Sequence, residues 1–464
     1  MAKKEKELLS GKLERVLLDS LKEIECGEKI PSERKLAEKH GVSRITVRDA
    51  IAKLENMGFL LRQVGRGTYV TGRHIEKLLV NILSCDFSHD ELSEVVESIN
   101  AENSKYKIDG EFHPEFNYES TEKLTISLAD SIKNNSRSKI ISVNEGNIAT
   151  LASQGALEPL DGLIANSKII KKNIFFQRLL KQYIVDGKIY GLPVCWSAPV
   201  LVYNKNIFKD YGISFPDNSW TWMDVQKACD IFNCPSEKQK LVKPLILDML
   251  NSSFLSTIFW QRGVRLFNEK KESNADKKEF LETVKFFDEM IHSHGAMPYM
   301  YENSFTTPFL FANDKIAMIT LFHALVHKAT DGKKRSEWGA VSLPGWKCNA
   351  TRLPSQGFAL TKSTDTTEAF QILEDFFDPK NVTKIAAATK RFPALESLKN
   401  EIPEFLLKQL DTKQLENEIP GKYRFYPPIR DELFMVWNKL EKPEQACKNI
   451  REKIEARKKE KFRT

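Results

Sequence analysis

Long apolar runs are missing from this sequence of 464 residues, since none approaches the roughly 18–20 residues that a membrane-spanning helix needs. The first residues are basic, but an amphipathic charged pattern follows them. A signal peptide would have a continuous apolar stretch and a small-residue cleavage site at that point. Because neither pattern is present, we expect a cytoplasmic protein.

Cysteine is sparse as well, with seven residues scattered along the chain and no Cys-x-x-C pair. Zinc-ribbon and thioredoxin-like sites need that pair, and a disulfide scaffold needs a much higher cysteine density. Catalytic triads and paired carboxylates are also missing. His323 and His327 have the one-turn spacing that can hold zinc, but no third ligand is evident. We therefore expect reduced thiols, no cofactor, no metal and no enzymatic site.

Positive charge is concentrated at the two ends of the chain, whose net charge is +7. Residues 1–75 hold 16 Lys and Arg against 11 Asp and Glu, and residues 448–464 hold 8 against 3, whereas the middle is close to neutral. This distribution is typical of a protein in which a small basic domain binds a polyanion and a larger, nearly neutral domain does not. The basic C-terminal segment is expected to be a solvated helix or tail.

The first 72 residues have the pattern of three helices followed by a hairpin. A second, short helix is expected between Ser32 as N-cap and Gly41 as its end, and a third helix begins after Ser43. Two β-prone runs on either side of Gly65-Arg66-Gly67 predict a hairpin. This order predicts a winged helix-turn-helix, whose third helix enters the major groove with its first turns. The expected buried residues are Leu13, Val16, Leu17, Leu21, Ile24, Val47, Ala50, Ile51 and Leu54.

Three segments of this unit resemble, in order and in spacing, the GntR family of bacterial transcription regulators: 27–34 (GEKIPSER), 43–48 (SRITVR) and 65–70 (GRGTYV). The resemblance implies that the unit binds operator DNA. The resemblance places major-groove contacts on or beside the exposed first turns of the third helix, and further DNA contacts at the wing. The serines at the helix starts are expected to bind phosphates. The expected contact residues are Ser32, Arg34, Ser43, Arg44, Thr46, Arg48, Gly65, Arg66 and Gly67.

The long body begins with alternating strands and helices. Strands are expected at 78–83, near 106–108 and at 139–143, with a helix through 124–132 and a short helix at 148–153. This alternation predicts a doubly wound α/β lobe that binds its ligand at the carboxyl ends of the strands. A GntR subgroup fused to an aminotransferase-like domain has a similar length. Its pyridoxal-phosphate signature and lysine motif are missing here.

Short phrases along the body resemble the family 1 extracellular solute-binding proteins, the two-lobed receptors of sugar transporters that include maltose-binding protein. In order they are 154–160 (QGALEPL), 186–193 (DGKIYGLP), 199–205 (PVLVYNK), 220–224 (WTWMD), 313–318 (NDKIAM), 343–345 (LPG) and 356–360 (QGFAL). The resemblance implies two α/β lobes that hold a ligand in the cleft between them. The chain is expected to cross between the lobes first near 196–204 and next near 317–322.

Sugars present apolar ring faces and a rim of hydroxyls, so their sites combine aromatic side chains with carboxylates and amides. We expect the ligand contacts on loops that the two-lobe plan turns inward. For each residue, packing or loop capping is a competing interpretation. The candidates are Asp86, Asn144, Glu145, Asn147, Trp196, Trp260, Phe322, His323 and Gln356.

The predicted fold is a small α+β winged helix-turn-helix (1–72), a linker (73–77), a two-lobed α/β domain of the type II periplasmic-binding-protein kind (78–445) and a basic C-terminal helix or tail (446–464). The predicted function is a GntR-type regulator that binds operator DNA as a homodimer and senses a small solute, a mono- or oligosaccharide. Two alternatives stay open. One is a transport receptor with an incidental N-terminal domain, and the other is an α/β enzyme that acts on sugars.

Overall fold

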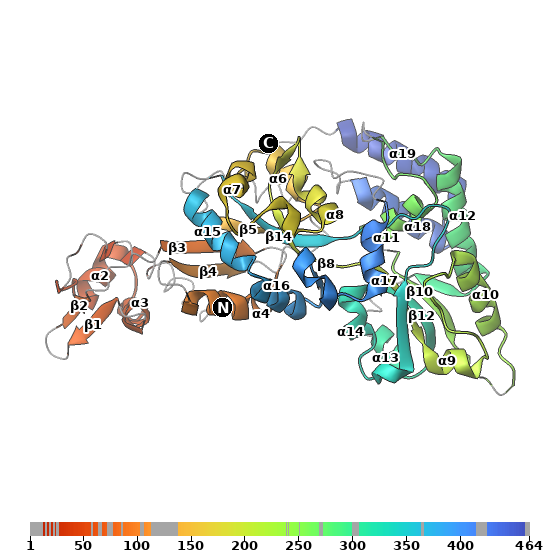
Figure 1. Ribbon diagram of the computed structural model, residues 1–464, viewed down its shortest axis with the longest axis horizontal. Helices are drawn as coiled ribbons and strands as arrows, with labels where there is room; N and C mark the ends of the chain where they lie inside the picture. Colours follow the sequence, from red (N-terminus) through yellow and green to blue (C-terminus); the bar gives the residue numbers. More distant parts are fainter. Residues whose placement is uncertain are drawn as a thin grey trace. The chain divides into compact units, whose positions relative to one another are not determined.

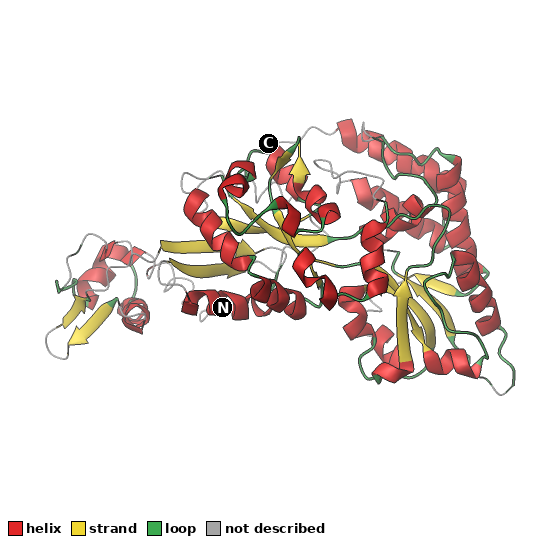
Figure 2. Ribbon diagram, in the orientation of Figure 1, coloured by secondary structure: helices red, strands yellow, loops and turns green. Residues whose placement is uncertain are grey.

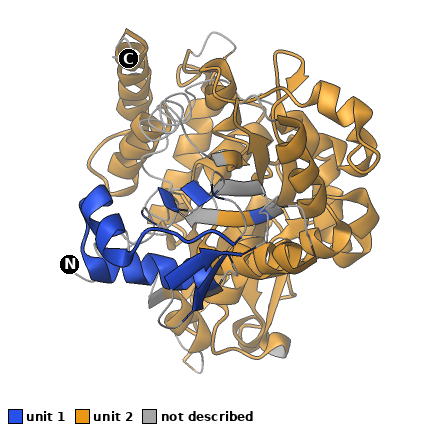
Figure 3. Cartoon of the chain, turned by 90° about the vertical axis from the view of Figure 1, so that its left-hand side faces the viewer, with its two compact units in different colours: residues 1–79, 103–107 blue, residues 80–102, 108–464 orange. Residues whose placement is uncertain are grey.

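The computed structural model describes residues 13, 16, 17, 20, 21, 24, 27–56, 59–63, 67–71, 78–84, 87–102, 106–112, 138–237, 239, 241–249, 251–268, 272–298, 306–362, 366–413 and 425–459. The chain divides into two compact units. The first comprises residues 1–79 and 103–107, and the second comprises residues 80–102 and 108–464 (Figure 3).

Two helices of the first unit form a helix-turn-helix with the predicted ends. Helix α2 (Glu33–His40) begins at Ser32, whose side chain accepts a hydrogen bond from the backbone N–H of Lys35. It ends at Gly41, which adopts the left-handed conformation with φ 63°. Helix α3 (Arg44–Asn56) follows after a turn of three residues. The predicted helix boundaries are therefore confirmed here.

A two-stranded antiparallel sheet follows these helices. Strand β1 (Leu60–Gln63) pairs with β2 (Gly67–Val70), and the register confirms the predicted hairpin. Val16 is 43% exposed, so its predicted place in the buried stripe of the first helix is wrong. Ile24 packs partly buried against the core. The buried core includes Leu13, Leu17, Leu21, Leu36, Val47, Ala50, Ile51 and Leu54.

The second unit contains two mixed sheets, each of which forms the centre of a lobe (Figures 1 and 2). The sheet of the first lobe has six strands in the order β15-β8-β14-β5-β3-β4. Strands β3 and β5 run parallel, whereas β14 is antiparallel to both β5 and β8. The strands are β3 (Leu78–Ser84), β4 (Tyr106–Phe112), β5 (Ser138–Asn144), β8 (Leu192–Trp196), β14 (Ser355–Leu360) and β15 (Phe392–Pro393).

The sheet of the second lobe has five strands in the order β11-β10-β12-β9-β13. Strands β10, β11 and β12 are parallel, and β9 runs antiparallel to both β12 and β13. The strands are β9 (Pro199–Asn204), β10 (Lys243–Leu247), β11 (Ala296–Pro298), β12 (Ile316–Phe322) and β13 (Trp338–Ser342). Strands β9 and β12 are buried along their whole length, which fits their central positions.

Helices pack against both sheets. In the first lobe, α15 packs on β5 and β14, and α16 packs on α4. In the second lobe, α12, α18 and α19 contact one another. The helices of the first lobe are α4 (His89–Glu102), α6 (Ile148–Ser153), α7 (Asp161–Asn166), α8 (Gln177–Leu180), α15 (Thr366–Phe376) and α16 (Pro379–Ala388). Strands β6 (Ile184–Val185) and β7 (Lys188–Ile189) form a small hairpin. The helix expected at 124–132 lies outside the described residues.

The remaining helices belong to the second lobe or lie between the sheets. They are α9 (Lys205–Asp210), α10 (Trp222–Asn233), α11 (Ser252–Gln261), α12 (Lys278–His292), α13 (Thr306–Ala312), α14 (Val326–Ala329), α17 (Glu404–Leu407), α18 (Tyr426–Trp437) and α19 (Pro443–Lys459). Fully buried phenylalanines dominate the core of the second lobe. None of the helices that the structure describes has both the length and the apolarity to cross a bilayer.

The chain crosses between the two sheets where β8 gives way to β9, at Ser197 and Ala198, as predicted. It returns between β13 and β14, across residues 343–354. The prediction of a second crossing at 317–322 is therefore wrong. Those residues form β12, which pairs with β10 and β9 in the middle of the second sheet. A third passage leads to α18, which packs in the core of the second lobe.

The described part of the basic C-terminal segment is a packed helix. The expected domain boundary at residue 445 falls inside α19. Four of its side chains enter the core of the second lobe: Ala446, Cys447, Ile450 and Ile454. Basic residues lie on the other faces, where Lys453 pairs with the carboxylate of Glu432. Helix α19 is therefore part of the second lobe.

Candidate functional site

The first turns of α3 present arginine side chains to solvent. Arg44 is exposed, and the side chain of Arg48 is 57% exposed. Arg34, on α2, has a side chain that is 74% exposed and lies 3.7 Å from the carboxylate of Glu38. An exposed guanidinium near the start of a recognition helix has the reach and the donors to bind guanine in a major groove. The three predicted arginines therefore have the accessibility that DNA contact needs.

Thr46 differs from these arginines because its residue is only 4% exposed. Its hydroxyl lies 2.8 Å from Ser43 Oγ, and its backbone N–H donates to the same oxygen at 3.1 Å. Thr46 lies in the first turn of α3, as expected, but its side chain is buried, since it stands four residues before buried Ala50 on the same helix face. Its contact with DNA stays a prediction. Ser43 and Ser32 both cap helices in the structure. Their contacts to phosphate stay a prediction.

The wing begins its second strand at Gly67, which has φ 123°. A Cβ atom at this position would lie 2.2 Å from Lys29 Cε, so a larger residue would displace that lysine side chain. The end of the Lys29 side chain can move aside, so it is the backbone angle that favours glycine here. Gly65 and Arg66, the other predicted wing residues, lie outside the described residues.

In the first lobe, the structure brings five predicted ligand residues to one edge of the sheet: Asn144, Glu145, Asn147, Trp196 and Gln356. Gln356 pairs with Asn144 across β14 and β5, and Trp196 lies opposite Ser355 at the end of β8. The turn after β5 is held by its own side chains. Asn144 Oδ1 accepts from the backbone N–H of Asn147, whose Oδ1 accepts from the N–H of Asn144. These two asparagines therefore have a capping role in the structure, and their ligand contact stays a prediction.

Glu145 forms a buried ion pair with Arg352. One of its carboxylate oxygens lies 3.2 Å from Arg352 Nη2, and the other accepts from the backbone N–H of Ser355 at 3.0 Å. The side chains of Glu145 and Arg352 are 4% and 1% exposed. Arg352 lies on the second crossing and also donates to the Tyr426 hydroxyl at 3.1 Å, which lies 2.8 Å from Ser256 Oγ. This chain of contacts connects β5 of the first lobe with α18 and α11 of the second.

Trp196 is fully buried where the first crossing begins. Its indole N–H donates to the carbonyl of Pro393 at 3.0 Å, and its ring lies 5.6 Å from that of Phe392. The crossing itself is tied to the return segment, because the backbone N–H of Ser197 donates to the carbonyl of Pro354 at 2.9 Å. In this structure Trp196 packs the crossing, and its role as a sugar platform stays a prediction.

Three other predicted residues belong to the second lobe, two of them at the end of β12 and one on α11. Phe322 ends β12 and is 5% exposed within the core. His323 follows it with its ring 4.3 Å from that of Phe392, and burial lowers the pKa of His323 to about 4. This imidazole is therefore neutral at neutral pH. Trp260 on α11 is fully buried, and its indole N–H has no partner among the described residues. Asp86 lies outside the described residues.

The sequence interpretation missed Asp248, which directly follows β10 at the same edge. Asp248 is 8% exposed, and its backbone N–H donates to Thr320 Oγ1 of β12 at 3.0 Å. Burial raises the pKa of its carboxyl to about 7. The signal that selected Asn144, a polar residue directly after a buried strand, is also present here. Among the described residues, no group of His, Cys, Asp and Glu could hold a metal ion.

The raised pKa of Asp248 makes stability depend on pH. The folded state binds this proton more tightly than the unfolded chain, whose aspartate pKa is about 3.9, so this contribution falls as the pH rises between the two values. We expect Asp248→Asn to become more stable relative to the wild type by about 1 kcal/mol from pH 6 to pH 7. Urea midpoints of both proteins at both pH values test this. His323 titrates in both proteins, so its contribution cancels when their stabilities are compared. The prediction would be contradicted if the difference in unfolding free energy between the two proteins were the same at both pH values.

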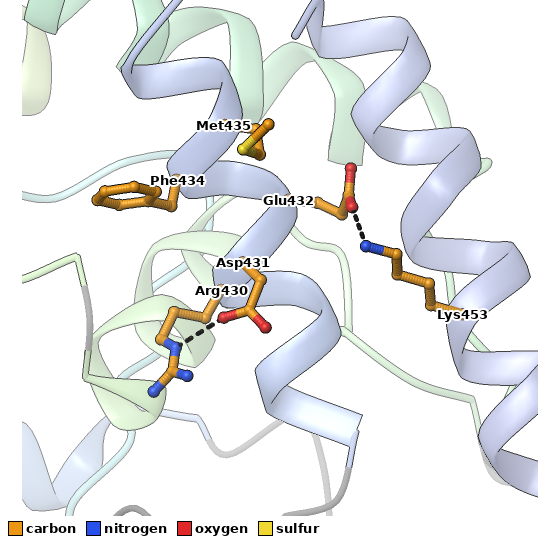
Figure 4. Close-up of a pocket in the computed structure, with 6 residues that line it drawn as sticks. All are labelled: Arg430, Asp431, Glu432, Phe434, Met435 and Lys453. Carbon is orange, nitrogen blue, oxygen red and sulfur yellow. Dashed lines mark hydrogen bonds and ion pairs between the residues drawn. The ribbon is translucent and has the colours of Figure 1, made fainter. Parts of the chain in front are cut away.

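A hollow of about 390 Å³ lies between α18 and α19 (Figure 4). Its charged side chains satisfy one another: Arg430 pairs with Asp431 at 3.2 Å, and Glu432 pairs with Lys453. None of the predicted ligand residues lines it. Phe434 and Met435 complete the lining. This hollow therefore contains none of the predicted ligand contacts, and those contacts stay a prediction.

The fold defines a two-lobed solute-binding domain preceded by a winged helix-turn-helix. Residues 94–406 match the family of bacterial extracellular solute-binding proteins, and the chain belongs to this family. Residues 12–70 match the bacterial regulatory proteins of the gntR family, so the first unit is a GntR-type domain. The predicted combination of the two domains is confirmed.

The relatives found by sequence are of two kinds, binding proteins and transcriptional repressors. A binding protein of Brucella abortus (strain 2308) is 25% identical over 234 residues, which cover 48% of this chain and 54% of that protein. The chain thus spans about half the length of that relative. The HTH-type transcriptional repressor NagR of Bacillus subtilis is 44% identical over 62 residues, which cover 13% of this chain and 26% of the repressor.

Solved structures match the body. The ABC substrate-binding protein Lmo0181 of Listeria monocytogenes, solved with cycloalternan, has a TM-score of 0.69 at 20% identity and covers 83% of this chain and 100% of its own. The GacH receptor of Streptomyces glaucescens, solved unliganded and with acarbose, has a TM-score of 0.68 at 16% identity and covers 82% and 98%. These similarities establish the two-lobed fold.

Proposed function

We propose that this protein is a transcription regulator that binds operator DNA through its GntR-type unit and senses a mono- or oligosaccharide between the lobes of its body. The observation that carries the proposal is that one chain joins exposed arginines on a recognition helix to a two-lobed solute-binding fold. The oligosaccharides in the Lmo0181 and GacH structures support a carbohydrate as the effector.

Location and assembly are part of the same proposal. Operator DNA lies in the cytoplasm, so a regulator acts there. One winged helix covers one half-site, and helix-turn-helix proteins usually bind near-palindromic operators as dimers. We therefore expect two protomers on each operator. The mass of the complex at saturating protein measures this, and one protomer on a full-length site would contradict it.

The effector is proposed to act by closing the lobes, because only the closed arrangement lets both sheet edges contact one ligand. Closure of two lobes about a hinge is a known two-state element. Glu145 and Gln356 come from the first lobe, whereas Asp248 and Trp260 come from the second. Carboxylates, an amide and an indole are the groups that sugar hydroxyls and ring faces bind. The two matched domains are of the regulator and solute-binding types, which favours a regulator over the enzymatic alternative.

A panel of sugars scored by thermal shift identifies the effector. A ligand at 100 times its dissociation constant stabilises the folded protein by about 2.7 kcal/mol, which is a readily measured shift. The family's extracellular members favour the transport-receptor alternative. Cell fractionation distinguishes the two functions, because a receptor would be found outside the cytoplasm as a processed chain.

Coupling between operator and effector must be reciprocal. If the effector changes operator affinity tenfold, the operator must change effector affinity tenfold, which is about 1.4 kcal/mol. We expect calorimetric titration of the effector to give different affinities with and without operator. A random duplex of equal length is the control. Equal effector affinities in the presence and absence of operator would show that the body does not regulate the DNA-binding unit by equilibrium coupling.

A further inference from the structure

Glu33, at the start of α2, contacts two arginines at once. Its Oε2 accepts from Arg48 Nε at 3.2 Å and from Arg48 Nη2 at 3.1 Å. Its Oε1 accepts from Arg62 Nη2 at 3.2 Å. The Glu33 side chain is 21% exposed, whereas Arg48 is 57% exposed. One carboxylate thus joins α2, the recognition helix α3 and the wing strand β1.

Arg62, the residue of the wing strand in this contact, also interacts with a second carboxylate, that of Glu55. Arg62 donates its backbone N–H to Glu55 Oε1 at 3.1 Å, and its Nε lies 3.8 Å from Glu55 Oε2. Arg62 is therefore held between Glu33 and Glu55. The carboxylate of Glu33 is fixed in turn by a strand of the hairpin. Because Arg62 holds its carboxylate, Glu33 offers Arg48 a partner in a fixed position. A glutamate that rotates freely at the surface would not do so.

The geometry at Arg48 decides which donors remain for DNA. A guanidinium has a side edge, formed by Nε and Nη2, and an end edge, formed by Nη1 and Nη2. Glu33 occupies the side edge. The end edge is then directed away from Glu33, and two donors on one edge match the O6 and N7 acceptors of guanine. A restrained arginine also loses less side-chain entropy when it binds.

We propose that Glu33 is a positioning residue for sequence recognition, which holds Arg48 so that its Nη1–Nη2 edge reads a guanine. The proposal rests on the proposed DNA-binding function. The same negative charge repels phosphates, so it also disfavours binding to DNA that offers no guanine at the right place. Glu33 therefore increases specificity more than affinity.

The test uses the full-length protein and operators selected by the wild type from random duplexes. Replacing each guanine in turn by 7-deazaguanine removes its N7 acceptor and identifies the guanine that Arg48 contacts, because Arg48→Ala no longer responds there. In Glu33→Gln we expect about tenfold weaker binding to the selected operator and unchanged or tighter binding to a random duplex. The penalty for 7-deazaguanine at that position should be largely lost.

Glu28→Gln is the matched control, because Glu28 is exposed in the same unit and its loss removes the same charge. It should leave the ratio of operator to random-duplex affinity unchanged. The proposal is overturned if Glu33→Gln keeps that ratio and the wild-type 7-deazaguanine penalty. It is also overturned if both affinities fall by one factor together with the melting temperature, which indicates a structural role. A wild type that selects no sequence would contradict the DNA-binding function itself.

Discussion

Arg352→Ala is expected to lower the free energy of unfolding of the body by about 3–5 kcal/mol, the usual cost of removing one partner of a buried ion pair. The reason is that Glu145 would keep its charge with a side chain only 4% exposed and without its cation. The Tyr426 hydroxyl would lose a donor as well. Denaturant unfolding, monitored by circular dichroism, measures the loss.

Two further variants separate the ion pair from general effects. Arg262→Ala removes a partly buried guanidinium that lies 3.4 Å from the centroid of the Trp346 ring, and it should cost about 1–2 kcal/mol. The double variant Glu145→Gln/Arg352→Met removes both charges together. The double variant should lose much less stability than the summed losses of the single variants Glu145→Gln and Arg352→Met, because neither charge is left unpaired. Additive losses would contradict the assignment of this buried pair.

Arg48→Ala is expected to weaken operator binding by about 1–3 kcal/mol, with most of the loss in sequence discrimination. Its side chain lies exposed on α3, where a recognition helix contacts bases. Arg66→Ala, at the predicted wing tip, should weaken binding with less loss of major-groove preference. Gel-shift titrations at one fixed salt concentration measure both variants. Unchanged operator affinity in both would exclude this DNA-binding surface.

Local signals predicted the first unit and the first lobe well. The caps at Ser32 and Gly41 and the strands at β3 and β5 lie where short-range patterns placed them. The second crossing was misplaced for a physical reason. An apolar run such as 316–322 has the same pattern whether it forms a central strand or joins two lobes, and only its pairing partners decide between them.

The candidate ligand site was harder to predict, because its contacts join distant parts of the chain. Glu145 was chosen as a ligand group, yet in the structure it pairs with Arg352, 207 positions later in the sequence. Spacing contains no information about such a pair. Trp196 likewise packs beside Phe392. Asp248 could have been found, since it follows a buried strand as Asn144 does.

The hydrogen bond that ties the two crossing segments together has a mechanical consequence. Ser197 on the outgoing segment is joined to Pro354 on the return segment, and its hydroxyl also accepts from the backbone N–H of Ala324. The chain passes between the lobes three times, and this hydrogen bond fastens two of the three connections side by side. We expect this fastening to favour rotation of the lobes about the line of these two connections over sliding of one lobe past the other. One dye on each lobe would follow this rotation as a distance in single-molecule fluorescence.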